Sequence, residues 1–563
     1  MENLPLVTIN ESLCRMCYAC VRVCPVKAIR MTEGDKTPRI LPERCIGCGL
    51  CVEACSPGAI SVRGSREEVK KILASGEQVV AITDPSISGE FDDITDYRKF
   101  VRMIKALGFH YVNEASFGVD LVARQYADMF VKIRGKNFIT SCCPVVVSYI
   151  EKYHPDLIPN LIPVVSPMIA SARVVRKKYG PDVKVVYIGP CIEAKNEILR
   201  FEGDARIDAV LTFRELRQLF EEAGINESML EYSDFNSPLG YKGSLYPISN
   251  GILQAASVSE DLLSGSVVTA EGKDSVLAAV EAFNRHINAI KSHFNLFFCE
   301  GCLMGPGMSK GGDKYLRRSL VIRYANKRLG NFNITGWERN MAEYGSISAE
   351  RDFRKDDQRL PEPDEETIRN ILRSLEMEKP EDELGCSACG YASCRDFAVA
   401  IAQGLATPEM CSVFSMKNKQ NYIRTLRQTN EQLARMQDAL KESERIARQE
   451  KESAREASAV IQSMLQKIPN ALVMVDHTMK VIHSNQGFID LIGDDAREIN
   501  EVIPGLVGAD IKTLLPHAMY TIFSYVLTSN EEVMNRDVRY QDNLYSISVF
   551  PIRPNRIVGA VIR

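Results

Sequence analysis

The clearest alternation of apolar and polar positions lies in the C-terminal third of the chain. For 60 residues after Pro408 there is neither Gly nor Pro, and leucine recurs every seven residues at Leu426, Leu433 and Leu440. This heptad spacing predicts a signalling coiled-coil helix over 416–460 and a parallel homodimer. Polar residues fill the other seam position: Asn430, Gln437 and Glu444. A solvated single helix that acts as a spacer therefore remains the alternative.

Short apolar runs with strand character follow this helix. They predict two strands at 469–476 and 479–485, a short helix at 488–492, and three further strands at 537–540, 543–550 and 556–562. Two strands, short helices and then three antiparallel strands resemble a PAS domain. We therefore expect a PAS-like α+β sensor domain over 461–563.

Length, charge and hydropathy narrow the class of protein. A chain of 563 residues predicts about three to five domains. The 69 Lys and Arg residues nearly balance 73 Asp and Glu, so the net charge of −4 favours neither a nucleic-acid nor a membrane partner. Apolar runs of membrane-spanning length and an N-terminal signal pattern are missing from the sequence. We expect a cytoplasmic protein.

Cysteine is the informative residue type. The chain has 17 cysteines but only 7 histidines. Cytosolic thiols are kept reduced, so disulfides are not expected, and the scarcity of histidine favours thiolate-bound iron–sulfur clusters over zinc–histidine sites. Eight cysteines lie between positions 14 and 55, five between 142 and 302, and four between 386 and 411. This uneven distribution predicts a modular chain.

The first eight cysteines form two similar runs of Cys-x2-Cys-x2-Cys-x3-Cys. This is the spacing of bacterial two-cluster ferredoxins, in which the fourth cysteine of each run binds the other cluster. One 4Fe–4S cluster is then expected on Cys14, Cys17, Cys20 and Cys55. The second is expected on Cys45, Cys48, Cys51 and Cys24. The alternative, a zinc module, fits two matching halves poorly. We place a two-cluster ferredoxin domain at 1–65.

The last four cysteines predict a small domain at 383–415. They are Cys386, Cys389, Cys394 and Cys411, and the fourth follows an apolar stretch from Phe397 to Leu405. The pattern resembles the small four-cysteine 4Fe–4S domain of electron-transfer subunits, with a zinc ribbon as the alternative. The charged segment before it, 340–382, is interpreted as a linker.

The middle five cysteines lie in three distant motifs: Thr-Ser-Cys142-Cys143-Pro, Gly-Pro-Cys191 and Cys299-x2-Cys302. Four cysteines from three loops can converge on one buried cluster, which leaves a fifth free for proton chemistry. A buried cluster that only transfers electrons is the alternative.

These motifs resemble the three signature loops of the iron–iron (FeFe) hydrogenases, over about 75–335. The resemblance implies an α/β domain with an H-cluster, which is a 4Fe–4S cubane joined to a di-iron subcluster. Carried over residue by residue, the cubane ligands would be Cys143, Cys191, Cys299 and Cys302. The thiolate of Cys302 would also bridge to the di-iron unit. Cys142 would be the proton-shuttling thiol, and Lys195 is the candidate for the lysine that contacts the di-iron unit.

Several positions differ from the usual pattern of the catalytic members. Gly189 stands where a methionine usually precedes Pro-Cys, and Ala194 stands where the lysine is expected, with Lys195 one residue further on. Gln125 and Tyr126 occupy a stretch that usually supplies acidic residues of the proton path. Such changes should slow turnover or shift potentials without preventing cluster binding. The Cys-x2-Cys-x2-Gly-Pro-Gly ending resembles the sensory branch of the family.

The sequence thus predicts a multidomain α/β and α+β protein. Its predicted function is a sensory hydrogenase, in which electrons from heterolytic dihydrogen splitting pass through 4Fe–4S clusters to a PAS module. Dihydrogen, protons, a ferredoxin-like or other redox partner, and a downstream signalling effector would be its partners. One alternative is a ferredoxin-coupled catalytic hydrogenase whose PAS domain serves only dimerisation. Another is an iron–sulfur redox sensor without the di-iron unit.

Overall fold

The computed structural model describes residues 5–132, 135–259, 263, 266–540, 542–552 and 557–562. The chain divides into two compact units, Met1–Gln420 and Asn421–Arg563. Within the described residues, no helix is both long and apolar enough to cross a membrane.

The N-terminal module has an internal repeat that matches its two cysteine runs. Strand β1 (Val7–Ile9) pairs with β4 (Ile60–Val62), and β2 (Ile29–Arg30) pairs with β3 (Arg39–Ile40), both antiparallel. Each cysteine run continues into one turn of helix, α1 (Ala19–Val23) or α2 (Leu50–Ala54). Each of these helices packs a buried valine, Val21 or Val52, into the same apolar core. The duplicated sequence therefore folds as a duplicated structure.

The next domain is built on a four-stranded parallel sheet in the order β6-β5-β7-β8. Its strands are β5 (Val79–Thr83), β6 (Tyr111–Glu114), β7 (Lys184–Gly189) and β8 (Ala209–Thr212). Every residue of β5 is buried, with Val80 and Ile82 in one apolar core and Val79 and Ala81 in another. Continuous apolar strands of this kind are typical of parallel sheets covered on both faces. The helices packed around the sheet include α3 (Arg66–Leu73), α5 (Tyr97–Ala106), α6 (Ser116–Lys132), α8 (Pro167–Tyr179) and α10 (Phe213–Glu222).

A second, smaller sheet completes this domain. Strands β9 (Val267–Glu271) and β10 (His293–Phe297) pair in parallel. The remaining helices are α4 (Ile87–Glu90), α7 (Pro144–Tyr153), α9 (Ala194–Glu197), α11 (Gly251–Ala255), α12 (Lys273–Arg285), α13 (Lys314–Leu329) and α14 (Ile334–Tyr344). Helix α14 belongs to the domain, since Met341 and Tyr344 are buried against Phe117. The domain therefore extends beyond the predicted boundary at 335.

The segment predicted as a linker, 340–382, is in fact part of the folded structure. Arg351 is buried and forms an ion pair of 2.6 Å with Glu197, and the backbone N–H of Arg354 donates to Glu151. Further on, α15 (Glu365–Ser374) buries Ile368 and Leu372 in the core shared with the N-terminal module and with α16 (Cys394–Ala402). The linker interpretation was wrong, because the high charge of this segment conceals an amphipathic helix and buried ion pairs.

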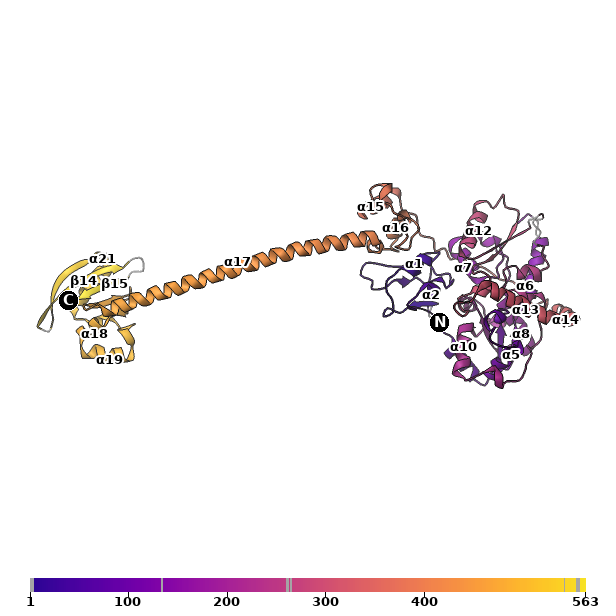
Figure 1. Ribbon diagram of the computed structural model, residues 1–563, viewed down its shortest axis with the longest axis horizontal. Coiled ribbons are helices and arrows are strands. Elements are labelled where there is room, and N and C mark those ends of the chain that lie inside the picture. The colour runs from indigo at the N-terminus through magenta and orange to yellow at the C-terminus, as the bar shows by residue number, and fades with distance from the viewer. Residues whose placement is uncertain are drawn as a thin grey trace. The chain divides into compact units, whose positions relative to one another are not determined.

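The long helix predicted from the heptads is α17 (Ser412–Lys467), a single helix of 56 residues (Figure 1). At about 1.5 Å per residue it is about 84 Å long. It begins directly after Cys411 and ends just before Pro469, so it is longer at both ends than the predicted 416–460.

The C-terminal domain is a five-stranded antiparallel sheet in the order β12-β11-β15-β14-β13. Its strands are β11 (Ala471–Val475), β12 (Val481–Ser484), β13 (Val533–Tyr540), β14 (Asn543–Ile552) and β15 (Ile557–Ile562). Four helices lie between β12 and β13: α18 (Gln486–Ile492), α19 (Asp494–Val502), α20 (Ile511–Leu514) and α21 (His517–Ser529). All five predicted strands are present, although Arg556, the first residue of the last one, lies outside the described residues.

Candidate functional site: a cysteine-lined cavity

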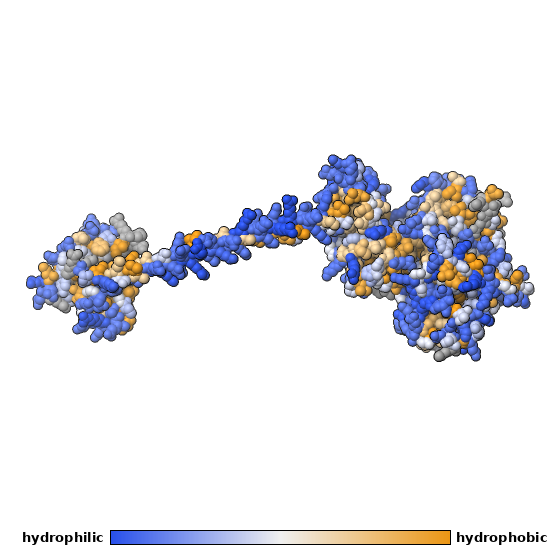
Figure 2. All heavy atoms as spheres, viewed as in Figure 1, coloured by the Kyte–Doolittle hydropathy of each residue, from blue (hydrophilic) through white to orange (hydrophobic). Residues whose placement is uncertain are grey.

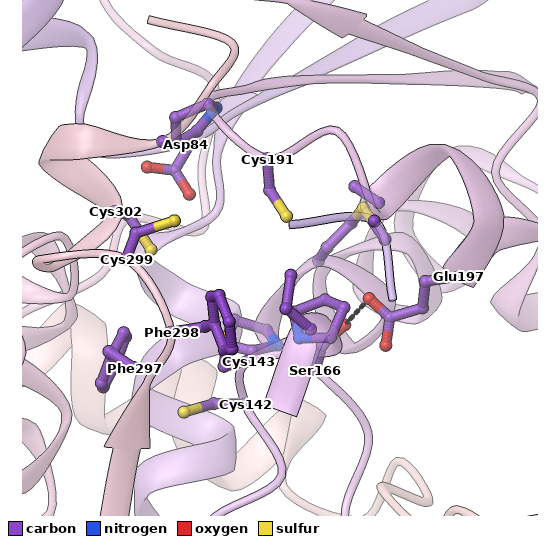
Figure 3. Close-up of a pocket in the computed structure, with 18 of the residues that line it drawn as sticks. Asp84, Cys142, Cys143, Ser166, Cys191, Glu197, Phe297, Phe298, Cys299 and Cys302 are labelled. Atoms are coloured by element: carbon purple, nitrogen blue, oxygen red, sulfur yellow. Dashed lines mark hydrogen bonds between the residues drawn. The ribbon is translucent and has the colours of Figure 1, made fainter. Parts of the chain in front are cut away.

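The candidate site is a cavity of about 50 Å³ in the domain with the parallel sheet. Its lining includes all five middle cysteines: Cys142, Cys143, Cys191, Cys299 and Cys302. Cys191 follows the carboxyl end of β7 and Cys299 follows that of β10, where parallel sheets typically place their ligand sites. Cys191 lies on one side of the space and Cys299 and Cys302 lie together on the other (Figure 3). The fold therefore unites the three motifs, as the sequence predicts.

Glycines permit the close contact between two of these loops. An added Cβ at either Gly305 or Gly307 would lie 2.7 Å from the carbonyl oxygen of Pro190, next to Cys191. The backbone N–H of Gly307 donates a hydrogen bond of 2.8 Å to this same carbonyl. The Gly-Pro-Gly sequence after Cys302 thus holds the third loop directly against the second.

A tyrosine occupies the space that a side chain at position 189 would need. A Cβ at Gly189 would lie 2.7 Å from Cε1 of Tyr187, whose ring lines the cavity. The Tyr187 hydroxyl donates a hydrogen bond of 2.7 Å to the buried carboxyl group of Asp84. Glycine at 189 is therefore coupled to the presence of Tyr187, which brings the Asp84 carboxyl to the cavity beside Cys302 (Figure 3).

The donor set fits an iron–sulfur cluster. The four predicted ligand cysteines are partly buried, and desolvation of their thiols raises the pKa of each above its ordinary value. A metal must replace the thiol proton before sulfur can act as a ligand. Backbone N–H groups of Val145, Val146 and Phe298 point at the sulfur of Cys143, the kind of hydrogen bond that tunes cluster potentials. A cubane bound here would be held by four residues: Cys143, Cys191, Cys299 and Cys302.

Cys142 lies in the same cavity but in a more enclosed position, only 1% exposed. Burial raises the pKa of its thiol to about 12. The thiol hydrogen-bonds to Thr140 and to Tyr126. The Tyr126 hydroxyl lies 3.2 Å from the hydroxyl of Ser141, which donates to the carbonyl oxygen of Val164 at 2.7 Å. This branch of hydrogen bonds ends on the backbone.

Lys195 does not line the cavity, and the prediction that it acts there was wrong. Its ammonium group donates hydrogen bonds of 2.9 and 2.8 Å to the two carboxylate oxygens of Glu215, and others to Ser65 and to the carbonyl of Arg63. Ala194 faces the cavity instead. Lys195 thus ties α9 to the segment that links the N-terminal module to β5.

The other twelve cysteines gather in three further cavities of about 20 Å³ each. One contains Cys14, Cys17, Cys20 and Cys55; the next contains Cys24, Cys45, Cys48 and Cys51; the last contains Cys386, Cys389, Cys394 and Cys411. These groups are the predicted ligand sets, including the exchange of the fourth cysteine between the two ferredoxin runs. All of these thiols are free of disulfides.

Contacts join the ferredoxin-like module to both of the other cysteine sites. Cys48 lines both its own cavity and the larger cavity that holds Cys191. At the other side of the module, Lys27 donates a hydrogen bond of 2.8 Å to the carbonyl of Gly390, one residue after Cys389. A Cβ at Gly390 would lie 3.0 Å from the backbone nitrogen of Arg22. The ferredoxin-like module therefore lies between the large cavity and the four-cysteine domain.

Comparison with known proteins assigns the first three domains. Family models match residues 77–302 (iron-only hydrogenase large subunit, C-terminal domain), 6–56 (4Fe–4S dicluster domain) and 383–413 (an Fe–S cluster). The periplasmic [Fe] hydrogenase large subunit of Nitratidesulfovibrio vulgaris is 30% identical over 285 residues, which cover 45% of this chain and 68% of that protein. The chain belongs to the iron-only (FeFe) hydrogenase family.

Two further relatives carry different functional names. The NADP-reducing hydrogenase subunit HndD of Solidesulfovibrio fructosivorans is 28% identical, and the match covers 38% of this chain but only 42% of that protein. The cytosolic Fe–S cluster assembly factor NAR1 of Kluyveromyces lactis is also 28% identical, over 48% of this chain and 62% of that protein. The chain is thus similar both to hydrogenases and to a protein that is named for the assembly of Fe–S clusters.

Asp84, Tyr187 and Tyr246 are cavity residues that the sequence motifs did not reveal. Tyr246 donates a hydrogen bond of 3.1 Å to the carbonyl of Cys142. One sequence signal could have revealed Asp84: it directly follows the apolar strand β5. The carboxyl ends of parallel strands meet at one edge of a sheet, which is where ligand sites lie.

Proposed function

We propose that this protein is a sensory hydrogenase, which responds to dihydrogen or to redox state and passes the signal to its C-terminal domain. The observation that carries the sensory role is the surroundings of Cys142. Its hydrogen bonds lead through Tyr126 and Ser141 to the backbone carbonyl of Val164, and through Thr140 to the amide of Asn295. Backbone carbonyl and amide groups do not relay protons as carboxylates do, so slow turnover is expected. Slow turnover suits a sensor.

The proposal assigns a role to each cavity residue. When bound, the H-cluster would supply the reversible conversion of dihydrogen into two protons and two electrons. Cys143, Cys191, Cys299 and Cys302 would hold it, and Cys142 would accept or donate a proton at its sulfur. Phe297 and Phe298 line the cavity and would limit the access of water to it.

The order of the cysteine cavities supports a route for the electrons. They would pass to the set around Cys48, then through the ferredoxin-like module, and reach the set that ends in Cys411. Because α17 begins at the next residue, Ser412, a change at this last cluster would act directly on the start of the long helix. A ferredoxin-like protein is the other proposed electron partner.

The long helix and the C-terminal sheet are the proposed output. The seam leucines of α17 are 42–62% exposed within one chain: Leu426, Leu433 and Leu440. Figure 2 shows apolar patches along an otherwise hydrophilic helix. A parallel homodimer would bury them. We assign the antiparallel sheet with its inserted helices to the PAS class on element order, and propose that it relays the signal to a downstream effector.

Infrared spectroscopy on anaerobically matured full-length protein tests this proposal. Carbonyl and cyanide bands that shift when hydrogen gas is added, together with hydrogen uptake far slower than that of a catalytic hydrogenase prepared alongside, are the expected result. Rapid turnover would instead favour a ferredoxin-coupled catalytic enzyme.

The similarity to NAR1 favours one second candidate, an iron–sulfur protein without the di-iron unit. In that case Cys142 would have no proton to transfer, and Cys143, Cys191, Cys299 and Cys302 would hold a plain cubane. Protein with full iron content but without carbonyl and cyanide bands, after maturation proven on a control hydrogenase, would establish this candidate and exclude the sensory hydrogenase.

A further inference from the structure

A much larger cavity lies where four parts of the first unit meet. Its volume is about 510 Å³. The ferredoxin-like module contributes Lys27 and Arg44, the end of α7 contributes Tyr153, the segment before α15 contributes Arg359, and the four-cysteine domain contributes Tyr391. The proposed function makes no use of this cavity.

The charge of the cavity wall favours an anion. Among the described lining residues three side chains are cationic at neutral pH, namely Lys27, Arg44 and Arg359, whereas one is a carboxylate, Asp396. Burial lowers the pKa of the neighbouring His154, which keeps this imidazole neutral at pH 7. The guanidinium of Arg359 is already paired with Asp357 at 2.7 Å and with Asp156 at 3.3 Å. Lys27 and Arg44 are therefore the two cations of the wall that can attract an anion.

Aromatic rings form a second part of the wall. Tyr149, Tyr153 and Tyr391 all line the cavity, and the guanidinium of Arg44 lies 5.5 Å from the centre of the Tyr153 ring. Rings and a guanidinium plane are surfaces on which planar bases stack. The volume also falls within the range of about 300–1,000 Å³ that is usual for small-molecule sites.

Two polar groups in this wall are left without partners. Among the described residues, Nε of Arg44 and the hydroxyl of Tyr391 are buried and have no hydrogen-bond partner. The two residues are only 8% and 3% exposed. Buried donors are rarely left unpaired, because each lost hydrogen bond is costly. The other guanidinium nitrogens of Arg44 are held by the carbonyls of Val26 and Gln358, so the side chain cannot turn away to find another partner.

We propose that this cavity binds a nucleotide, with its phosphate near the cationic side chains Lys27 and Arg44 and its base against the tyrosine rings. The ligand would contact Lys27, three residues after Cys24, and Tyr391, two residues after Cys389. It would thus bridge the ferredoxin-like module and the four-cysteine domain and regulate the contact between them. This inference goes beyond the sensory role and does not depend on it.

Calorimetric titration of the cluster-loaded full-length protein with AMP, GMP and UMP tests the proposal. At least one of these mononucleotides should bind with one site per chain, whereas inorganic phosphate and the matching nucleoside should each bind at least about tenfold more weakly, since each offers half of the contacts. Absence of binding by all three at about 1 mM, or equal binding of phosphate alone, would overturn it.

Two variants locate the site. Ala392→Trp should abolish nucleotide binding, because Ala392 is an exposed lining residue and the indole would fill the cavity. Tyr391→Phe removes a hydroxyl that has no partner in the free protein. Because the nucleotide would supply that partner, the variant should bind it about three- to tenfold more weakly. Tyr315→Phe, at a tyrosine 73% exposed and outside the cavity, is the matched control. Undiminished binding to Ala392→Trp protein that retains its cluster absorbance would place the nucleotide elsewhere and contradict the proposal.

Discussion

The hydrogenase-like domain and the long helix α17 use apolar side chains in opposite ways. In the domain, β5 is buried along its whole length and two apolar cores enclose the sheet that carries the cysteine loops. In α17 the structure buries none of the 56 residues, and leucines with a seven-residue spacing remain exposed. The first region is complete within one chain. In the second the apolar side chains stay exposed within one chain, which is why we propose a partner helix for it.

The largest effect is expected from removing a cysteine of the enclosed cavity. Cys302→Ala should eliminate the cluster at this site and lower the iron content by at least about four atoms per chain, because a 4Fe–4S cluster needs its four thiolates. Cys142→Ala, the neighbouring cysteine that is not a proposed ligand, should keep the iron. Iron analysis with electron paramagnetic resonance of the other clusters measures both. Equal iron loss in the two variants would contradict the assigned ligand set.

The next effect concerns the exposed helix. Leu433→Asp with Leu440→Asp should convert a dimer into a monomer, because burial of four leucines per dimer contributes roughly 6–12 kcal/mol. Gln428→Asp, on the outer side of the heptads, is the control and should remain dimeric. Analytical ultracentrifugation of the cluster-loaded protein reads out the state. A wild-type monomer at micromolar concentration would show that α17 is a solitary spacer and would remove the dimer from the proposal.

A smaller effect is expected at Gly189, which stands where catalytic members usually have a methionine and which packs against Tyr187. Gly189→Ala should cost about 1–3 kcal/mol of stability, since its Cβ would overlap the ring of Tyr187. Tyr187→Ala should relieve that overlap, so the double variant should be more stable than the sum of the two single changes predicts. Denaturant unfolding of all three variants gives the coupling. Strict additivity would mean that Gly189 and Tyr187 are independent.

Local patterns allowed much of this architecture to be predicted from the sequence. The spacing of the ferredoxin cysteines predicts sets that the structure brings together, because short loops between ligands leave few ways to surround a cluster. Heptads and the absence of Gly and Pro predict α17. The exact end at Lys467 was missed, because the heptads fade before the helix meets Pro469.

Contacts between distant residues could not be predicted in this way. Lys195 is adjacent to a motif, yet its partner Glu215 lies in α10 and draws the ammonium away from the cavity. Arg351 and Glu197 form an ion pair across more than 150 residues, which no local pattern reveals. From sequence alone, a highly charged segment can therefore be either a solvated linker or a folded segment whose charges form buried ion pairs.

The smallest effect should come from Tyr126, and it distinguishes an enclosed cavity from an open proton path. Tyr126→Phe removes a hydroxyl that accepts from the backbone N–H of Ser141 at 3.0 Å, so it should cost about 1–3 kcal/mol of stability. Hydrogen uptake should change less than about twofold, because the branch from Tyr126 ends on the Val164 carbonyl and relays no proton. Uptake with an artificial electron acceptor measures this, beside Cys142→Ala, which should lose most of its activity. A loss of about a hundredfold in Tyr126→Phe protein with intact clusters would show that protons leave through this tyrosine. The cavity would then have an open proton path, and the argument from slow proton transfer to a sensory role would fail.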